Sequence, residues 1–269
     1  MKNKNMLLVL LAGQSNMAGR GIAGPDDLTD IPGLLAFGRD GKWHPAIEPV
    51  TRDRSFVGTF DANGSKMLSP DPWDNIMPDT GGFIRGVGPG RTFGICLLKD
   101  NPGRTVGLLP FAVGGTPIAS WAPGGTDIVD RNYRCYDEAV RMGREAQKDG
   151  EIAAILWHQG EGDACHMTEN YEEKLKQVIL NFRRDLALGD DVPFLLGELA
   201  EFYGAQTNIM PGVPMVNGAM HHLAQTMPNV GVADAKGLHH VGDELHFDAA
   251  SAHELGRRYY ALYKKISGR

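Results

Sequence analysis

Met6-Leu7-Leu8-Val9-Leu10-Leu11 lies near the N-terminus and leads into Gly13-Gln14-Ser15-Asn16-Met17-Ala18-Gly19. A continuous apolar run of this length is typical of a buried strand in a parallel sheet. The glycines that follow permit a sharp turn. Ser15 is therefore expected just past the carboxyl end of a central strand, where open α/β sheets bind their ligands. The simpler alternative is that Ser15 and Asn16 only form a turn or cap a helix.

Strands and helices alternate after this stretch. Each expected strand is short and apolar. The expected helix after Thr168 repeats apolar residues at steps of three and four, and the last expected helix carries its apolar residues on one face. Asp130 and Thr168 are the expected N-caps of two helices. The expected helices span 91–99, 130–148, 168–186, 215–226 and 248–265, and the further strands span 105–109, 152–157, 192–196 and 230–233. This order predicts one α/β domain over 1–269, with a parallel sheet of about five strands and helices on both faces.

The segment 22–90 breaks the alternation. It is rich in Gly, Pro and Asp and has little periodicity. A loop of this length inside a compact domain is usually functional. We therefore interpret it as a loop-rich insertion that covers one side of a site. Arg52, Trp73 and Arg85 either contact a substrate there or pack the insertion onto the body of the domain.

Composition excludes several classes of function. The formal net charge is −6 and no basic run is present, which argues against nucleic-acid and anionic-membrane binding. No apolar stretch is long enough to span a bilayer. Lys2 and Lys4 precede the apolar run as in a signal peptide, but cleavage after Ala12 would remove the first strand. We expect a soluble protein that is cytoplasmic, or secreted if this is a mature form. The oligomeric state is left open.

Polar residues follow several strands. After the strand 105–109 comes Gly114-Gly115-Thr116-Pro117-Ile118-Ala119-Ser120-Trp121, after 152–157 comes His158-Gln159-Gly160-Glu161-Gly162-Asp163, and after 230–233 comes Asp243-Glu244-Leu245-His246. The carboxyl ends of parallel strands meet at one edge of a sheet. Gathered there with Ser15, these loops predict a single site.

Acyl transfer is the chemistry that these residues fit. A serine hydroxyl needs a base to become a nucleophile, and His246 can serve because its ordinary pKa is near neutral. Asp243, three residues earlier, can orient the imidazole. The backbone N–H groups of Ser15 and Gly115 and the side-chain amide of Gln159 are the candidate oxyanion donors.

Other residues near these loops keep open roles. Gln14, Asn16 and Gly114 are expected near the site without an assigned function. His158 is expected to be structural. Glu161 either bonds to His158 or backbone N–H groups, or assists the catalytic histidine. His239 and His240 compete with His246, and with Asp243 they suggest a metal site. The usual ligand spacing is absent, so no metal and no cofactor is expected. Cys96, Cys135 and Cys165 form neither a disulfide framework nor a zinc motif.

These motifs together resemble the SGNH/GDSL hydrolases. Gly13-Gln14-Ser15-Asn16-Met17-Ala18-Gly19, Gly114-Gly115-Thr116 with Trp121, Trp157-His158-Gln159-Gly160-Glu161, and Asp243-x-x-His246 are similar to the branch of carbohydrate esterase family 6 acetylxylan esterases and sialate O-acetylesterases. The resemblance implies a three-layer flavodoxin-like fold and metal-independent serine esterase chemistry. By position, Ser15 matches the nucleophile, Asp243 and His246 the acid and base, and Gly115 and Gln159 the oxyanion contributors. Either Gly114 or Gly115 donates.

The resemblance implies hydrolysis of O-acetyl groups from a carbohydrate substrate through an acetyl-enzyme. One alternative is a lipase or thioesterase of the same fold, which would need an apolar trough for a longer acyl chain. The other is a catalytically inactive carbohydrate-binding module. Inactive copies usually lose a triad member, whereas Ser15, Asp243 and His246 are all present.

Overall fold

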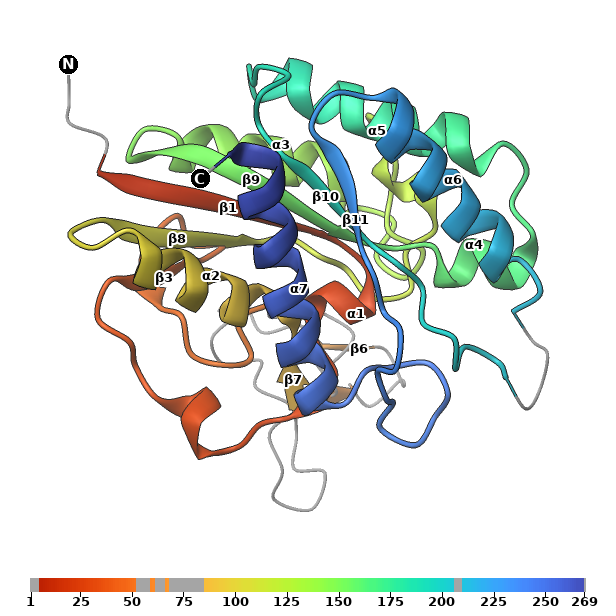
Figure 1. Ribbon diagram of the computed structural model, residues 1–269, viewed down its shortest axis with the longest axis horizontal. Helices are drawn as coiled ribbons and strands as arrows, with labels where there is room; N and C mark the ends of the chain where they lie inside the picture. The colour runs from red at the N-terminus through yellow and green to blue at the C-terminus, as the bar shows by residue number, and fades with distance from the viewer. Residues whose placement is uncertain (1–4, 52–58, 61–65, 68–84, 206–209, 269) are drawn as a thin grey trace.

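A mostly parallel sheet of seven strands forms the centre of the protein (Figure 1). The computed structural model describes residues 5–51, 59–60, 66–67, 85–205 and 210–268. The strand order is β11-β10-β9-β1-β8-β3-β4. The strands are β1 (Met6–Gly13), β3 (Leu34–Phe37), β4 (Trp43–Pro45), β8 (Thr105–Pro110), β9 (Gly150–His158), β10 (Phe194–Gly197) and β11 (Val230–Ala233). All neighbours pair in parallel except β3 and β4.

The first strand, β1, lies at the middle of this sheet. It pairs in parallel with β8 on one side and with β9 on the other, and Leu7 to Ala12 are all buried. Burial on both faces explains why its sequence is a continuous apolar run rather than an alternating one. The carboxyl end of β1 therefore has a fixed position between the ends of β8 and β9.

Helices cover both faces of the sheet (Figure 1). The helices are α2 (Pro89–Asp100), α3 (Cys135–Ala146), α5 (Tyr171–Asp185), α6 (Val213–Thr226) and α7 (Ala249–Ser267). α2 and α7 pack together on one face, and α3, α5 and α6 lie on the other. The direction of winding reverses between β1 and β9, and ligands bind at such a reversal in open α/β sheets. The expected three-layer α/β fold is confirmed, while a single domain over 1–269 stays a prediction.

The segment 22–90 contributes more to the sheet than expected. β3 and β4 both come from it, so the sheet has seven strands and the expected count of about five is too low. Leu34-Leu35-Ala36-Phe37 is buried against β8, but a four-residue strand is too short to show a period. Among the described residues of this segment, the other short elements are η1 (Pro25–Leu28), β5 (Thr59–Phe60), β6 (Lys66–Met67) and β7 (Arg85–Val87). β7 pairs with β2 (Gly21–Ile22).

Two expected helix starts are wrong. α3 begins at Cys135, and the side chain of Asp130 instead accepts a hydrogen bond from the backbone of Asn132. α5 begins at Tyr171 after Asn170, and Thr168 does not cap it. Polar residues that suit an N-cap also suit turns, so the residue type alone does not locate the helix start. Two short helices, α4 (Glu161–His166) and η4 (Ile118–Trp121), were not expected.

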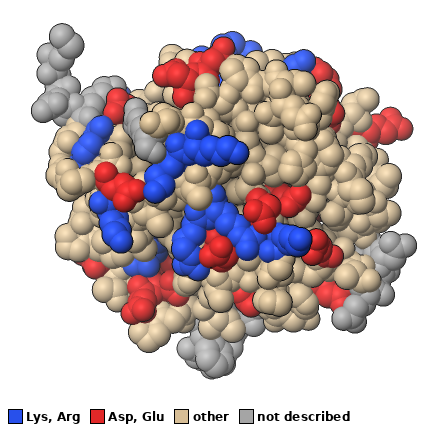
Figure 2. All heavy atoms as spheres, in the orientation of Figure 1, with Lys and Arg blue, Asp and Glu red and all other residues tan. Residues whose placement is uncertain are grey.

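Basic side chains gather over α2 and α7, with acidic side chains among them (Figure 2). On α7, Arg258 pairs with Asp234 and Arg257 pairs with Glu254, both at 2.8 Å. Lys264 lies 3.5 Å from Asp100. The basic charge on this face is therefore matched by acidic neighbours. Within the described residues, no helix combines the length and apolarity needed to cross a membrane.

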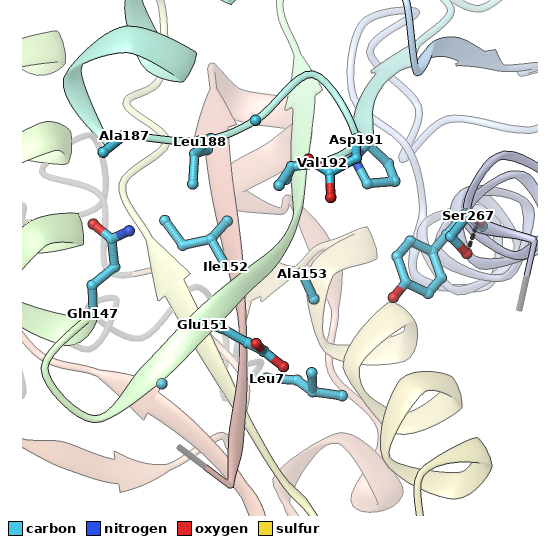
Figure 3. Close-up of a pocket in the computed structure, with 14 residues that line it drawn as sticks. Leu7, Gln147, Glu151, Ile152, Ala153, Ala187, Leu188, Asp191, Val192 and Ser267 are labelled. Carbon is cyan, nitrogen blue, oxygen red and sulfur yellow. Dashed lines mark hydrogen bonds between the residues drawn. The ribbon is translucent and has the colours of Figure 1, made fainter. Parts of the chain in front are cut away.

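A hollow of about 440 Å³ lies at the amino-terminal ends of β1 and β9 (Figure 3). Leu7, Glu151, Ile152 and Asp191 are among the residues that line it. Ser15 follows the opposite end of β1, so this hollow is at the far edge of the sheet from the candidate site.

Gly13 is a tightly packed backbone position next to the Ser15 loop. Its φ is +125°, and a Cβ placed there would lie 2.1 Å from the carbonyl oxygen of His158. We predict that Gly13→Ala lowers the free energy of unfolding by at least about 2 kcal/mol, because the backbone must move and the dihedral is strained. Chemical denaturation measures this loss.

Gly103→Ala is the matched control. Gly103 also has a positive φ, +81°, but a Cβ there meets nothing within 4 Å. The free energy of unfolding of Gly103→Ala should fall by only about 1 kcal/mol, because only the backbone dihedral is strained. Equal losses in the two variants would contradict the close approach at Gly13.

Candidate active site

Ser15 lies where β1 ends and the short helix α1 (Ser15–Ala18) begins. Gly13 pairs with His158 at the end of β9, and the backbone N–H of Gln14 donates to the carbonyl oxygen of His158 at 2.8 Å. The nucleophile loop is thus joined to the carboxyl end of the neighbouring strand. Ser15 itself is 4% exposed.

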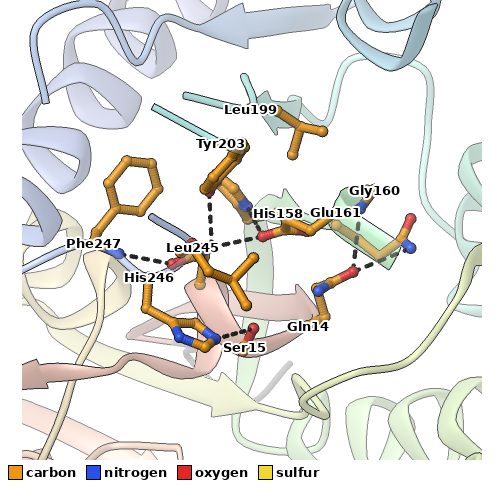
Figure 4. Close-up of polar contacts among 12 residues, drawn as sticks. Gln14, Ser15, His158, Gly160, Glu161, Leu199, Tyr203, Leu245, His246 and Phe247 are labelled. Carbon is orange, nitrogen blue, oxygen red and sulfur yellow. Dashed lines mark hydrogen bonds and ion pairs between the residues drawn. The ribbon is translucent and has the colours of Figure 1, made fainter. Parts of the chain in front are cut away.

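His246 connects Ser15 to Asp243. Its Nε2 lies 3.1 Å from Oγ of Ser15 (Figure 4). Its Nδ1 lies 2.6 Å from Oδ2 of Asp243. The other carboxylate oxygen of Asp243 accepts hydrogen bonds from the backbone N–H groups of Leu245, at 2.9 Å, and His246, at 2.8 Å. The turn from Asp243 to His246 is therefore wrapped around the carboxylate that contacts the imidazole.

Two pKa shifts fit this arrangement. Burial raises the pKa of Asp243, but its hydrogen bonds from His246 and Leu245 outweigh burial and leave the pKa below its ordinary value. Burial lowers the pKa of His246, and the nearby charge of Arg20 adds to this, while Asp243 and Glu161 act in the opposite direction. The net pKa of His246 is below 6.5, so the imidazole is neutral and able to accept a proton at neutral pH.

Asn16, the residue after Ser15, binds the backbone on both sides of His246. Its Nδ2 donates to the carbonyl oxygen of Leu245 at 3.0 Å, and its Oδ1 accepts from the N–H of Phe247 at 3.1 Å. The same Nδ2 also lies 2.7 Å from Oε1 of Glu161 and 2.8 Å from the hydroxyl of Tyr203. Asn16 is 2% exposed, so these contacts are shielded from water.

Glu161 is a buried carboxylate beneath this contact. Burial raises its pKa, but the proximity of His158 and the hydrogen bond from Asn16 outweigh burial and leave the pKa below its ordinary value. Nδ1 of His158 lies 3.4 Å from Oε1 of Glu161, close enough for an ion pair but without hydrogen-bond geometry. Neither residue is more than 1% exposed. Both lie behind the site rather than at its surface.

Gln159 joins three loops from inside the protein. Its Nε2 donates to the carbonyl oxygen of Thr116 at 3.1 Å, to a carboxylate oxygen of Asp163, and to Oε1 of Gln14 at 3.4 Å. The hydroxyl of Tyr171 donates to its Oε1 at 3.1 Å. Gln159 is fully buried. Its amide donors are therefore engaged within the protein, which differs from the expectation that they face an oxyanion.

Gly115 is exposed in the turn after β8, with a φ of +74°. The next residue, Thr116, is the one whose carbonyl oxygen binds Gln159, and the N–H of Val113 donates to the carbonyl oxygen of Gly13 at 2.9 Å. This turn thus lies beside the Ser15 loop. Among the described residues, the backbone N–H groups of Ser15 and Gly115 have no hydrogen-bond partner. Gly114 is buried at the start of the turn.

The remaining candidate residues lie elsewhere. Nδ1 of His240 accepts hydrogen bonds from the N–H groups of Gly242 and Glu244, which gives it a role in the shape of its loop. No group of three or more His, Cys, Asp or Glu in the described part of the chain could hold a metal. His221, His222 and His253 each pair with a carboxylate away from Ser15. Arg52, Trp73 and the side chain of Arg85 lie outside the described residues.

Tyr203 is the site residue that sequence reasoning missed. It lies in an irregular segment after β10, is 5% exposed and accepts a hydrogen bond from Asn16. Burial raises the pKa of Tyr203 well above 10, so its hydroxyl stays neutral. The only signal in the sequence is its position after a strand of the sheet, at the same edge as Ser15.

Comparison with known proteins identifies relatives over nearly the whole length. The family model for carbohydrate esterase, sialic acid-specific acetylesterase, matches residues 5–265. A probable carbohydrate esterase of Arabidopsis thaliana is 29% identical over 256 residues, which are 93% of this chain and 86% of that protein. An X-ray structure of an Arabidopsis thaliana protein has a TM-score of 0.71 at 28% identity, with 97% of this chain and 98% of that chain covered.

Two further structures are similar in fold alone. NanS has a TM-score of 0.69 at 16% identity, with 98% of both chains covered. A carbohydrate acetylesterase from Xanthomonas citri has a TM-score of 0.62 at 17% identity, with 97% of this chain and 56% of that chain covered. The family-model match over residues 5–265 confirms the resemblance to the sialate O-acetylesterase-like branch. The family match shows that the chain belongs to the carbohydrate esterases of the sialic acid-specific acetylesterase family, and it is a carboxylic ester hydrolase of the carbohydrate acetylesterase type.

Proposed function

We propose that this enzyme removes O-acetyl groups from carbohydrates by a Ser15–His246–Asp243 triad and an acetyl-enzyme intermediate. The observation that carries the proposal is the unbroken path from Oγ of Ser15 to Nε2 of His246 at 3.1 Å and from Nδ1 to Asp243 at 2.6 Å. A nucleophile, a base and an orienting carboxylate within hydrogen-bond reach are the parts that acyl transfer needs.

In the proposed reaction, Oγ of Ser15 attacks the acetyl carbonyl carbon while Nε2 of His246 takes its proton. The ester C–O bond then breaks, and His246 returns the proton to the departing sugar oxygen. Water enters, His246 removes one of its protons, and the resulting attack on the acetyl-serine breaks the bond to Oγ and releases acetate. His246 returns the proton to Oγ of Ser15, which restores the free enzyme. Asp243 keeps the ring oriented and stabilises its charged form throughout.

The backbone N–H groups of Ser15 and Gly115 are the proposed oxyanion donors, since neither has another partner among the described residues. Gln159 reaches an oxyanion only by releasing Thr116, Asp163 or Gln14. We therefore assign Gln159 the role of fixing the Gly115 turn relative to the Ser15 loop, in place of the donor role expected from the sequence.

The proposed substrate is an acetylated sugar of the sialate or acetylxylan type. The family description names sialic acid, and the sequence of the long segment 22–90, which follows the Ser15 loop in the chain, is typical of a functional loop. Relative rates of acetate release from O-acetyl sialic acid and acetylated xylan would separate these two substrates.

Ser15→Ala should lower kcat/KM for acetyl esters by roughly a thousandfold or more, because no other group replaces the nucleophile. The measurement is acetate release from p-nitrophenyl acetate and from the sugar panel. Extending the aryl ester series from acetate to octanoate should give a steep fall with acyl length. Full activity in Ser15→Ala would contradict the triad, and a preference for octanoate would instead indicate a lipase.

Acid pH should switch the enzyme off through His246. Protonated imidazole cannot accept the serine proton, so kcat/KM is lost as pH falls through the pKa of His246. Because burial and Arg20 hold this pKa below 6.5, the acid midpoint should lie below 6.5 and activity should be level at neutral pH. A pH profile of acetate release, with folding checked by circular dichroism over the same range, measures the midpoint. A midpoint well above 6.5 would contradict the assignment.

A further inference from the structure

The hydrogen bonds of Asn16 place it between the nucleophile and the base. It follows Ser15 directly in the chain, and its carboxamide binds the carbonyl of Leu245 and the N–H of Phe247, the two backbone groups that flank His246. One short side chain thus fixes the His246 backbone on both sides. Any shift of that backbone would change the 3.1 Å separation between Nε2 of His246 and Oγ of Ser15.

Glu161 favours the same orientation of the Asn16 carboxamide as the backbone groups beside His246 do. The amide nitrogen lies 2.7 Å from Oε1 of Glu161 and 3.0 Å from the carbonyl oxygen of Leu245, and both of these are acceptors. A flipped amide would turn its oxygen toward both acceptors and its nitrogen toward the N–H of Phe247. The buried carboxylate therefore favours the one orientation that binds both sides of His246.

We propose that Asn16 is a positioning residue that holds the His246 imidazole on Ser15, and that Glu161 acts through Asn16 by fixing the orientation of its carboxamide. This inference rests on the proposed function of Ser15 and His246. It gives Glu161 a role in catalysis without contact with substrate. It also gives a reason for keeping the Glu161 carboxylate close to His246, although Glu161 is only 1% exposed and its pKa stays below the ordinary value.

A purely structural carboxamide would affect folding but not turnover, and the chain contains a matched example. Asn217 on α6 binds both backbone groups of Leu199, with its Oδ1 2.9 Å from the N–H and its Nδ2 2.9 Å from the carbonyl oxygen. It thus binds one backbone carbonyl and one backbone N–H, as Asn16 does, on a segment that does not carry His246. Asn217→Ala is the control for losing such a pair.

The test compares Asn16→Ala, Glu161→Gln, the double variant and Asn217→Ala on p-nitrophenyl acetate, with thermal unfolding recorded for each. Asn16→Ala should lower kcat by roughly a hundredfold with KM changed less than about threefold, because a misplaced base slows the chemical step. Asn217→Ala should lower the unfolding temperature and keep kcat within about twofold.

Glu161→Gln keeps the shape of the side chain and should lower kcat by about tenfold, but by less than about twofold when Asn16 is already Ala. The double variant also removes the buried carboxylate that loses its hydrogen bond from Asn16 in Asn16→Ala, so it remains informative if the single variant does not fold.

Two outcomes would overturn the inference. One is a folded Asn16→Ala or double variant with kcat within about twofold of wild type. The other is a Glu161→Gln effect on kcat that is equally large in the wild type and in the Asn16→Ala variant. Ser15→Ala, measured alongside, separates a failure of the positioning role from a failure of the proposed function. If Ser15→Ala is inactive and the Asn16 variants are not impaired, only the positioning role fails. If Ser15→Ala is active, the proposed function fails.

Discussion

The contact between Nε2 of His246 and Oγ of Ser15 joins residues that are 231 positions apart in the chain. No local structure can bring them together, so their separation of 3.1 Å depends on the whole sheet. Ser15 is fixed because β1 is buried between β8 and β9. His246 lies on the loop between β11 and α7, and α7 packs on α2 and β11. A general base must be within hydrogen-bond reach of its proton, and the fold supplies that reach.

Buried hydrogen bonds tie the loops at this edge of the sheet to one another. Gln159 links the turn after β8 to the Ser15 loop, and Asn16 links the Ser15 loop to the segment around His246. Buried polar groups favour one arrangement because each unpaired donor or acceptor is costly. The catalytic groups are thus positioned by side chains that do not themselves react. The positioning side chains and the catalytic groups meet at Gln14, Ser15 and Asn16.

The pattern of apolar and polar residues along the chain was sufficient to predict the elements in which that pattern is clear. The apolar run Met6–Leu11 predicted β1, and the polar residues after the strands predicted which loops meet. Leu34–Phe37 was missed because four residues carry no clear period, and Asp130 and Thr168 were misassigned because capping residues also form turns. The roles of Tyr203 and of the Gln159 amide depend on partners far away in the chain, Asn16 and Thr116, which no local pattern specifies.

The central claim is that Ser15 carries the acetyl group during turnover. Its most direct test is to mix the enzyme with excess p-nitrophenyl acetate, quench in acid within the first turnovers, and locate the acetyl group by peptide mass analysis. The account predicts one acetyl group on Ser15, together with a burst of nitrophenol if hydrolysis of the acetyl-enzyme is the slow step. Acetylation of a different residue that is required for turnover would contradict it.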